Sequence, residues 1–260
     1  MIVDVHVHVF PEKIADKASS GIAKFYDMPV RYDGRLETVL KLSDEAGVDK
    51  LILNSAATSP SQVESINDFI SGCVSSAPER LYGLMTLHPD YENIDAEVER
   101  CAAMGLRGVK LHPDFQEFNI DDPKAFGIYE AIQGRLPLLV HTGDFRYEWS
   151  KPSRMARVME LFPKLEVIGA HFGGWSEWDD ALEAFKGKRV WVDTSSSMYA
   201  MTDEQIKHMI KAYGIDRVMF GTDFPMWGPE PELERLRGLG LTSSELDMIL
   251  YKNAEDLFKL

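Results

Sequence analysis

The sequence predicts a (β/α)₈ barrel, and three observations support this fold class. Eight short runs rich in Val, Ile and Leu recur along the 260 residues. Segments of helix length, with polar and apolar residues mixed at helical spacing, separate these runs. The runs are continuously apolar, which is typical of parallel strands buried on both faces. A barrel of this type needs roughly 250 residues, so we expect a single domain over residues 1–260.

The first predicted strand begins close to the N-terminus. It carries Asp4, His6 and His8 inside an apolar run and lacks the basic flank of a signal peptide, so we interpret it as part of the mature protein. The eight predicted strands are Ile2–Val9, Lys50–Asn54, Leu81–Leu87, Arg107–Leu111, Leu136–His141, Leu165–His171, Arg189–Thr194 and Arg217–Thr222.

Helices are predicted between these strands and at the end of the chain. Gly47 is a stop signal for the first of them, and Thr202 with Gln205 resembles a capping box. The connection from Phe10 to Arg35 is long and is predicted to form a lid or rim over the barrel mouth. The predicted helices are Leu36–Ala46, Ser61–Ser75, Asp95–Met104, Pro123–Ile132, Ser153–Leu161, Glu177–Phe185, Glu204–Tyr213, Glu230–Arg237 and Ser243–Leu257.

A doubly wound open sheet is the alternative fold. Its nucleotide-binding form has a glycine-rich turn after the first strand. Here Phe10, Pro11 and Glu12 follow that strand, so this fingerprint is absent.

Composition argues against several classes of partner. Acidic residues outnumber basic ones 42 to 28, which gives a net charge of −14, and no cluster of Lys and Arg stands out. Nucleic acid and an anionic membrane surface are therefore not expected as partners. No run approaches the roughly 20 apolar residues of a membrane span. Cys73 and Cys101 have no metal-ligand spacing, so we expect buried free thiols and a cytoplasmic location.

Five polar residues stand at the carboxyl ends of predicted strands. His6 and His8 are two apart on the first strand, so both imidazoles share one face. The others are His141 after the fifth strand, His171 after the sixth and Asp223 after the eighth. Barrel enzymes build their active sites at these strand ends. A single strand histidine is more often an ordinary core residue, but the whole set favours a metal site.

The predicted metal ligands are His6, His8, His141 and Asp223. In a closed barrel the eighth strand lies beside the first, so Asp223 can meet the histidine pair while His141 reaches in from across the mouth. Three imidazoles and a carboxylate suit Zn²⁺ and also accept Mn²⁺, Fe²⁺ or Co²⁺. A water on such a metal is a strong nucleophile at neutral pH.

The segments DVHVHVF, LLVHTGD, GAHFGG and FGTDFP resemble the motifs of the amidohydrolase superfamily. The resemblance is greatest to the amidohydrolase-related group that also contains metal-dependent decarboxylases, and it runs from Val3 to Asn253–Phe258. It implies that the four predicted ligands bind the metal. It also implies that His171 is an acid or base in mononuclear members and a ligand of a second metal in binuclear ones. Asp223 would also accept a proton.

Lys110 lies on the fourth predicted strand and has three interpretations. Its ammonium could contact the substrate carboxylate or a metal ligand, which we rank first. The resemblance offers a carboxylated lysine that bridges two metals as the second. An ordinary pairing with an acidic residue at the barrel mouth is the third.

Further substrate contacts are predicted from the loops that follow the strands. His112 shares a face with Lys110, and Arg146 could hold a carboxylate. Trp149, Trp175 and Trp227 could form apolar pocket walls.

The leading functional prediction is hydrolysis of an amide, lactone or ester bond in a small molecule by a metal-activated water. The alternative is nonoxidative decarboxylation, or hydration, of a small aromatic or unsaturated carboxylic acid on the same ligands. A metal-dependent nuclease or phosphoesterase is disfavoured by the negative charge and by Lys110. A binding protein that has lost activity is disfavoured by the complete ligand set. One Zn²⁺ and a small-molecule substrate, for example a carboxylate, are expected; homodimers are common in the group.

Overall fold

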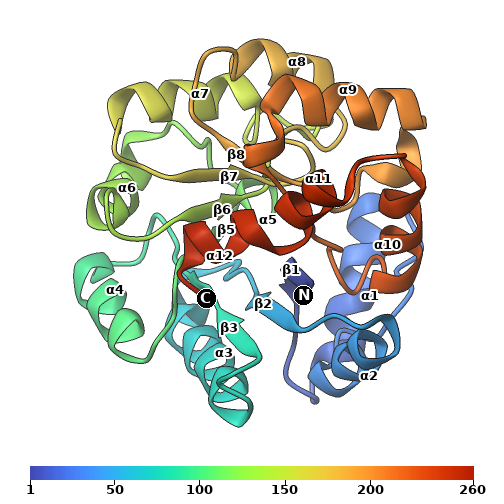
Figure 1. Ribbon diagram of the computed structural model, residues 1–260. Helices are drawn as coiled ribbons and strands as arrows, with labels where there is room; N and C mark the ends of the chain where they lie inside the picture. The colour runs from blue at the N-terminus through green and yellow to red at the C-terminus, as the bar shows by residue number, and fades with distance from the viewer.

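A computed structural model describes residues 1–260, and its strands form a closed parallel barrel surrounded by helices (Figure 1). All eight predicted strands are present, the third being divided into β3 and β4 at Leu84. The strands are β1 (Val3–His8), β2 (Lys50–Asn54), β3 (Leu81–Gly83), β4 (Met85–Thr86), β5 (Val109–Leu111), β6 (Leu138–Val140), β7 (Val167–Gly169), β8 (Trp191–Asp193) and β9 (Val218–Met219).

Hydrogen bonds close the barrel between its first and last strands. Parallel pairing runs in chain order from β1 to β3 and from β4 to β9. The amide of Leu84 donates to the carbonyl oxygen of Leu53 at 2.8 Å, which joins the two sheets. The amides of Val5 and His8 donate to the carbonyl oxygens of Phe220 and Phe224, so the segment that follows β9 lies against β1.

The predicted helices are also present, with ends shifted by a few residues. Gly47 caps the first of them in a left-handed conformation, and Thr202 with Gln205 forms the predicted capping box. Two helices, α1 and α5, were not predicted. The helices are α1 (Ala15–Tyr26), α2 (Leu36–Ala46), α3 (Val63–Ser76), α4 (Ile94–Ala103), α5 (Pro113–Gln116), α6 (Phe126–Ile132), α7 (Pro152–Leu161), α8 (Trp178–Ala184), α9 (Asp203–Tyr213), α10 (Pro229–Gly238), α11 (Ser243–Asp247) and α12 (Asn253–Phe258).

The hydrophobic core has an outer and an inner part. A cluster of 52 buried residues fills the space between strands and helices, and a cluster of 12 residues includes the inward side chains of the strands. Ala254 and Phe258 of α12 join this inner cluster, and Figure 1 shows α12 crossing the barrel end where both termini lie. That end is therefore closed by apolar packing, which leaves the carboxyl ends of the strands as the open face.

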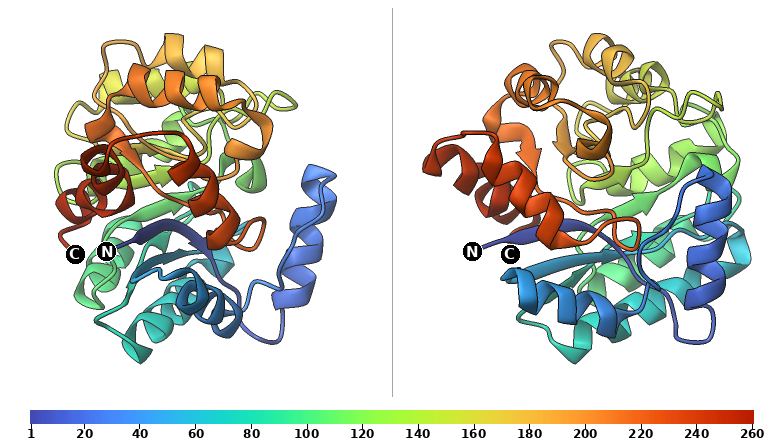
Figure 2. Two further views of the ribbon diagram at one scale, coloured as in Figure 1. Left: turned by 45° about the vertical axis from the view of Figure 1, so that its right-hand side comes forward. Right: turned by 90° about the vertical axis from the view of Figure 1, so that its right-hand side faces the viewer.

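Helix α1 lies at the open face. In the right-hand view of Figure 2 the termini are at one end of the barrel and α1 is at the opposite end. This places the Phe10–Arg35 connection over the barrel mouth, where a lid or rim was predicted. Cys73 and Cys101 are buried and free. None of the helices combines the length and apolar character required to cross a bilayer.

Candidate metal centre

His6, His8 and Asp223 bring three ligand atoms together at the barrel mouth. The Nε2 atoms of His6 and His8 are 3.1 Å apart, and Oδ1 of Asp223 is 3.5 Å from the first and 3.3 Å from the second. Two atoms that each bind one ion at about 2.1 Å must lie about 3.0–3.4 Å apart. Two of the three separations lie in this range and the third, 3.5 Å between His6 and Asp223, is close to it, so the three residues fit a single divalent cation.

His141 and His171 form a second pair in the same cavity. Nδ1 of His141 is 3.0 Å from Nε2 of His171. Both rings line one small cavity together with His8, Lys110 and Asp223. The structure thus gathers all the predicted ligands at one place, with His141 directed at His171 rather than at the His6–His8 pair.

An irregularity in β1 turns the two histidines toward the site. The pairing register with β2 shifts between Asp4 and Val7. Val3 and Val5 belong to the inner cluster before the shift, whereas Val7 packs in the outer core after it. Strict alternation would not direct Val5 and His8 to the same side, but a bulge re-aims the following side chains. The histidine pair therefore faces the barrel mouth.

Two site residues occupy a backbone conformation that is costly for ordinary side chains. His171 has a φ of 61° and Asp223 a φ of 62°, both in the left-handed region. Such positions cost on the order of 1–3 kcal/mol each and are characteristic of functional sites. The amide of Asp223 also donates to the carbonyl oxygen of His6 at 2.8 Å, which fixes the acid relative to the histidines.

Asp193 and Ser195 hold the rear of the site and were missed by the sequence analysis. Oδ2 of Asp193 is 3.0 Å from Nδ1 of His6, and Oδ1 accepts the backbone amide of His171 at 2.9 Å. Ser195 Oγ lies 2.9 Å from Nδ1 of His6. A carboxylate on the far nitrogen of a metal-binding histidine fixes its tautomer and orientation. The available signal was an acid at the end of the seventh strand, equivalent to Asp223 at the end of the eighth.

Replacing Asp193 with asparagine is expected to weaken metal binding by about tenfold to a hundredfold. The amide is nearly isosteric but cannot hold the His6 imidazole with a negative charge. Competition with a chelator of known affinity would measure the change. Asp90, an exposed acid beside His88, supplies the matched control Asp90→Asn. Unchanged affinity in Asp193→Asn would show that the carboxylate does not orient His6.

Asp114 occupies the corresponding position behind His141. Its Oδ2 is 3.5 Å from Nε2 of His141, and both side chains are buried. Burial raises the pKa of Asp114 to about 7. The contact leaves Nδ1 as the nitrogen of His141 that faces the cavity. This residue was also missed, because it lies in the short helix α5 that the sequence analysis did not predict.

Burial keeps the site histidines neutral at pH 7. It lowers the pKa of His6 to about 3 and also lowers the pKa values of His8, His141 and His171. Burial opposes ionisation of Asp223, but the neighbouring histidines hold the pKa of its carboxyl below the ordinary value. Neutral imidazoles and an ionised carboxylate are the forms that bind a metal.

Lys110 points into the same cluster. Its Nζ is 2.9 Å from Nε2 of His6, and the side chain is fully buried. Burial lowers the pKa of Lys110 to about 8, against the opposing charges of Asp223 and Asp193. Asp223 and Asp193 act on the ammonium through their charge and not through a hydrogen bond, which disfavours the ordinary ion pair among the three interpretations.

Tyr26 of α1 covers the cavity. Its hydroxyl is 2.8 Å from Nε2 of His112, so one of the predicted substrate contacts is joined to the covering helix. The enclosed space is about 20 Å³, enough for about one water molecule.

The other predicted substrate contacts lie outside this cavity. Arg146 is bound to the buried carboxylate of Asp144 and donates to the carbonyl oxygen of Phe25 at 2.5 Å, so its guanidinium holds the end of α1. Trp149 stacks on Tyr147, and Trp175 packs against Tyr26. Trp227 stacks on Tyr199 and donates to Ser196 Oγ at 2.9 Å.

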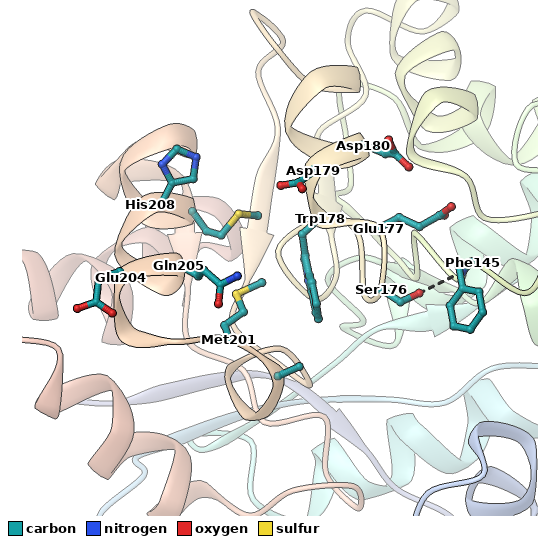
Figure 3. A pocket seen from close by; sticks show the side chains of 12 residues that line it. Phe145, Ser176, Glu177, Trp178, Asp179, Asp180, Met201, Glu204, Gln205 and His208 are labelled. Atoms are coloured by element: carbon teal, nitrogen blue, oxygen red, sulfur yellow. Dashed lines mark hydrogen bonds between the residues drawn. The ribbon is translucent and has the colours of Figure 1, made fainter.

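A larger hollow of about 650 Å³ lies between α8 and α9 (Figure 3). Trp178 and Gln205 lie on its two sides, and Asp179, Asp180 and Glu204 are at its edges. None of the metal-centre residues lines it. His208 is exposed here, and the hollow plays no part in the site described above.

The fold and the ligand cluster define a metal-binding barrel of the amidohydrolase type. The chain belongs to the amidohydrolase family, whose model matches residues 3–260. Among curated proteins it is 32% identical to the decarboxylase orsB of Emericella nidulans over 40% of this chain and 38% of that protein. It is 22% identical to the gamma-resorcylate decarboxylase of Polaromonas sp. over 85% of this chain and 86% of that enzyme.

Solved structures confirm the barrel fold. The 5-carboxyvanillate decarboxylase of Sphingomonas paucimobilis has a TM-score of 0.79 at 18% identity, covering 100% of this chain and 99% of the other. A dihydroxybenzoic acid decarboxylase of Polaromonas sp. with bound manganese has a TM-score of 0.77 at 18% identity, with coverage of 100% and 97%. A probable 2-pyrone-4,6-dicarboxylic acid hydrolase of Acinetobacter baumannii has a TM-score of 0.73 at 17% identity, with coverage of 100% and 99%.

Proposed function

We propose that the protein is a metal-dependent decarboxylase of a small aromatic carboxylic acid. Hydrolysis was the leading prediction from the sequence, and decarboxylation was the alternative. Both curated relatives are decarboxylases, and one of them aligns over most of this chain. That relationship favours the alternative over hydrolysis, although hydrolases also occur among the structural neighbours.

The observation that carries this proposal is the charge of the cavity at the metal centre. Lys110 is the one lysine or arginine that lines it, and it lies beside the ligand cluster. A single ammonium next to a divalent cation suits one carboxylate. A pyrone dicarboxylate would bring a second carboxylate, for which the cavity has no further cation, and an unpaired buried charge is costly.

Decarboxylation of an aromatic acid replaces the carboxylate on a ring carbon by a proton. The ring carbon receives the proton, the carbon–carbon bond breaks and CO₂ leaves, and the electron pair of that bond returns to the ring, which regains its aromaticity. A bound divalent ion would orient the oxygen atoms of the substrate and offset their charge. Lys110 would balance the remaining negative charge. His171 and Asp223 face the cavity and would hold and deliver the proton.

We propose one divalent ion per chain, held by His6, His8, Asp223 and His141. Zn²⁺ was expected from the ligand types, but manganese is bound in a structural neighbour, so Mn²⁺ is an equal candidate. A carboxylated Lys110 with a second ion, bound in part by His171, is the alternative arrangement.

Release of CO₂ from aromatic acids would test the proposed reaction. Protein stripped of metal and then reloaded with Mn²⁺ or Zn²⁺ would be supplied with 2,6-dihydroxybenzoate, which carries a single carboxylate. We expect CO₂ and the decarboxylated phenol in equal amounts, only after metal is restored. Opening of a lactone such as 2-pyrone-4,6-dicarboxylate, without CO₂ release from any aromatic acid, would contradict decarboxylation and restore hydrolysis.

A further inference from the structure

An uncharged groove of about 490 Å³ lies beside the metal centre, between α1 and α3 and the residues that follow β2. We refer to it as the α1–α3 groove. Its volume falls within the roughly 300–1,000 Å³ of pockets that bind small organic molecules. Neither an acidic side chain nor a lysine or arginine lines it. The apolar side chains that define it are Ile14, Ile22, Phe25, Ile66, Phe69 and Phe115.

The groove adjoins the metal-centre cavity. His8, Ile22 and Phe115 line both spaces. The cavity alone has room for about one water molecule, so any organic ligand of the metal centre must extend beyond it. His8 is the metal-binding residue that faces the groove, which makes the groove the adjoining space on that side.

The lining also exposes apolar surface that the fold itself does not use. Ile14 is 48% exposed, and Ile66 and Phe69 are only partly buried. Covering such side chains with an apolar group removes their surface from water and is favourable. A charged group in the same place would have no ionic partner and would lose its hydration.

We propose that the α1–α3 groove binds an apolar substituent of the substrate. The substrate class is then a monocarboxylic acid that carries an alkyl or aryl group several carbons long, with its carboxylate at the metal centre. This inference relies on the proposed function only for the carboxylate that binds at the metal centre. It adds that compounds with a second charged group at the far end are poor ligands.

The test separates the groove from the reaction by using ligands that do not react. Straight-chain alkyl hydroxamates bind divalent metals through one head group and differ only in chain length. Calorimetric titration of Mn²⁺-loaded protein would give their dissociation constants from acetohydroxamate to octanohydroxamate. Complete burial of each added methylene predicts an affinity gain of about fourfold per carbon until the groove is filled.

Two variants would remove this dependence in different ways. Ile66→Glu places a carboxylate in the groove, and Gly21→Trp fills it from α1. A Cβ at Gly21 meets no atom within 4 Å, and glycine is a poor helix former, so the second change does not require the helix to unfold. In both variants the affinity ratio of octanohydroxamate to acetohydroxamate should fall by at least about tenfold, since each lost methylene counts about fourfold.

Leu161→Glu is the matched control, because Leu161 is an apolar residue of α7 that is 53% exposed away from the groove. It should keep the wild-type ratio. Thermal unfolding would confirm that each variant is folded. A wild-type affinity that does not change with chain length, or a ratio that survives in both groove variants, would overturn the inference.

The outcomes for the groove and for the reaction are distinguishable. If hydroxamate affinity depends on chain length but no acid releases CO₂, the groove binds apolar groups and decarboxylation is rejected. CO₂ release from 2,6-dihydroxybenzoate without chain-length dependence would support decarboxylation and reject the groove.

Discussion

Replacing His6 with alanine is expected to reduce metal affinity by more than about 100-fold. Loss of a residue that only hydrogen-bonds to a metal ligand costs up to about 100-fold, and loss of the ligand itself should cost more. His6 contributes Nε2 to the ligand cluster, and its ring also contacts Lys110 and Asp193. Removing the ring leaves the fully buried Asp193 carboxylate without this partner. Because His6 is neutral, the loss is a hydrogen bond to a buried carboxylate, and leaving such a group without a partner costs about 1–3 kcal/mol or more. Elemental analysis should therefore find almost no metal, and urea unfolding should show a less stable protein.

His208→Ala is the matched control for this experiment, because His208 is an exposed residue of α9. It should keep the wild-type metal content and stability. Lys110→Ala in the same series distinguishes one ion from two. About one ion per chain in wild type that survives in Lys110→Ala would support the mononuclear site. About two ions that fall to one or none would support the carboxylated lysine. Full metal occupancy in His6→Ala would reject the ligand assignment.

Replacing His171 with asparagine is expected to lower kcat by about 10²- to 10⁴-fold while the metal remains bound. The imidazole lines the cavity, and its Nδ1 is 3.0 Å from the carbonyl oxygen of Ser195, which orients the ring. Asparagine can replace that hydrogen bond but cannot transfer a proton near neutral pH. Steady-state kinetics on an active aromatic acid should show the effect in kcat much more than in KM.

His88→Asn is the control, since His88 is 4% exposed but lies outside the cavity. Its kcat should remain within a few-fold of wild type. Metal content decides how a low rate is interpreted. If His171→Asn loses an ion, His171 is a ligand rather than an acid or base. If its kcat is unchanged with metal bound, proton transfer belongs to another group.

The repeating pattern of the fold was predictable, because every barrel strand is a buried apolar run and its helix follows within a short distance. Helix α1 was not predicted, although the lid position of its segment was. It contains Ser19, Ser20 and Gly21, which are weak helix formers, and only two of its residues are buried. Packing of Phe25 and Tyr26 against Phe115 and Arg146 holds this helix in place, and such contacts between distant segments leave no local signal.

The residues of the site with a fixed position on a strand were also predictable. His6 and His8 are two apart on one strand, and Asp223 follows the strand that closes the barrel beside them. The carboxylates that support these residues could not be predicted. Asp193 and Asp114 act through side chains that are distant in sequence, and an isolated acid near a strand end is common. Arg146 was predicted to hold a carboxylate of the substrate, and in the structure its guanidinium contacts Asp144 and the carbonyl oxygen of Phe25 in α1.

Barrel closure between β1 and the segment after β9 has a consequence for how the protein matures. His6 and His8 leave the ribosome well before Asp223, which follows His6 by 217 residues (223 − 6). The nascent chain therefore carries the histidine pair without its carboxylate until Asp223 has been added. Folding proceeds along the chain during synthesis, but the amide of Asp223 reaches the carbonyl of His6 only when the barrel is complete. The three-residue cluster of His6, His8 and Asp223 is thus completed only late in folding.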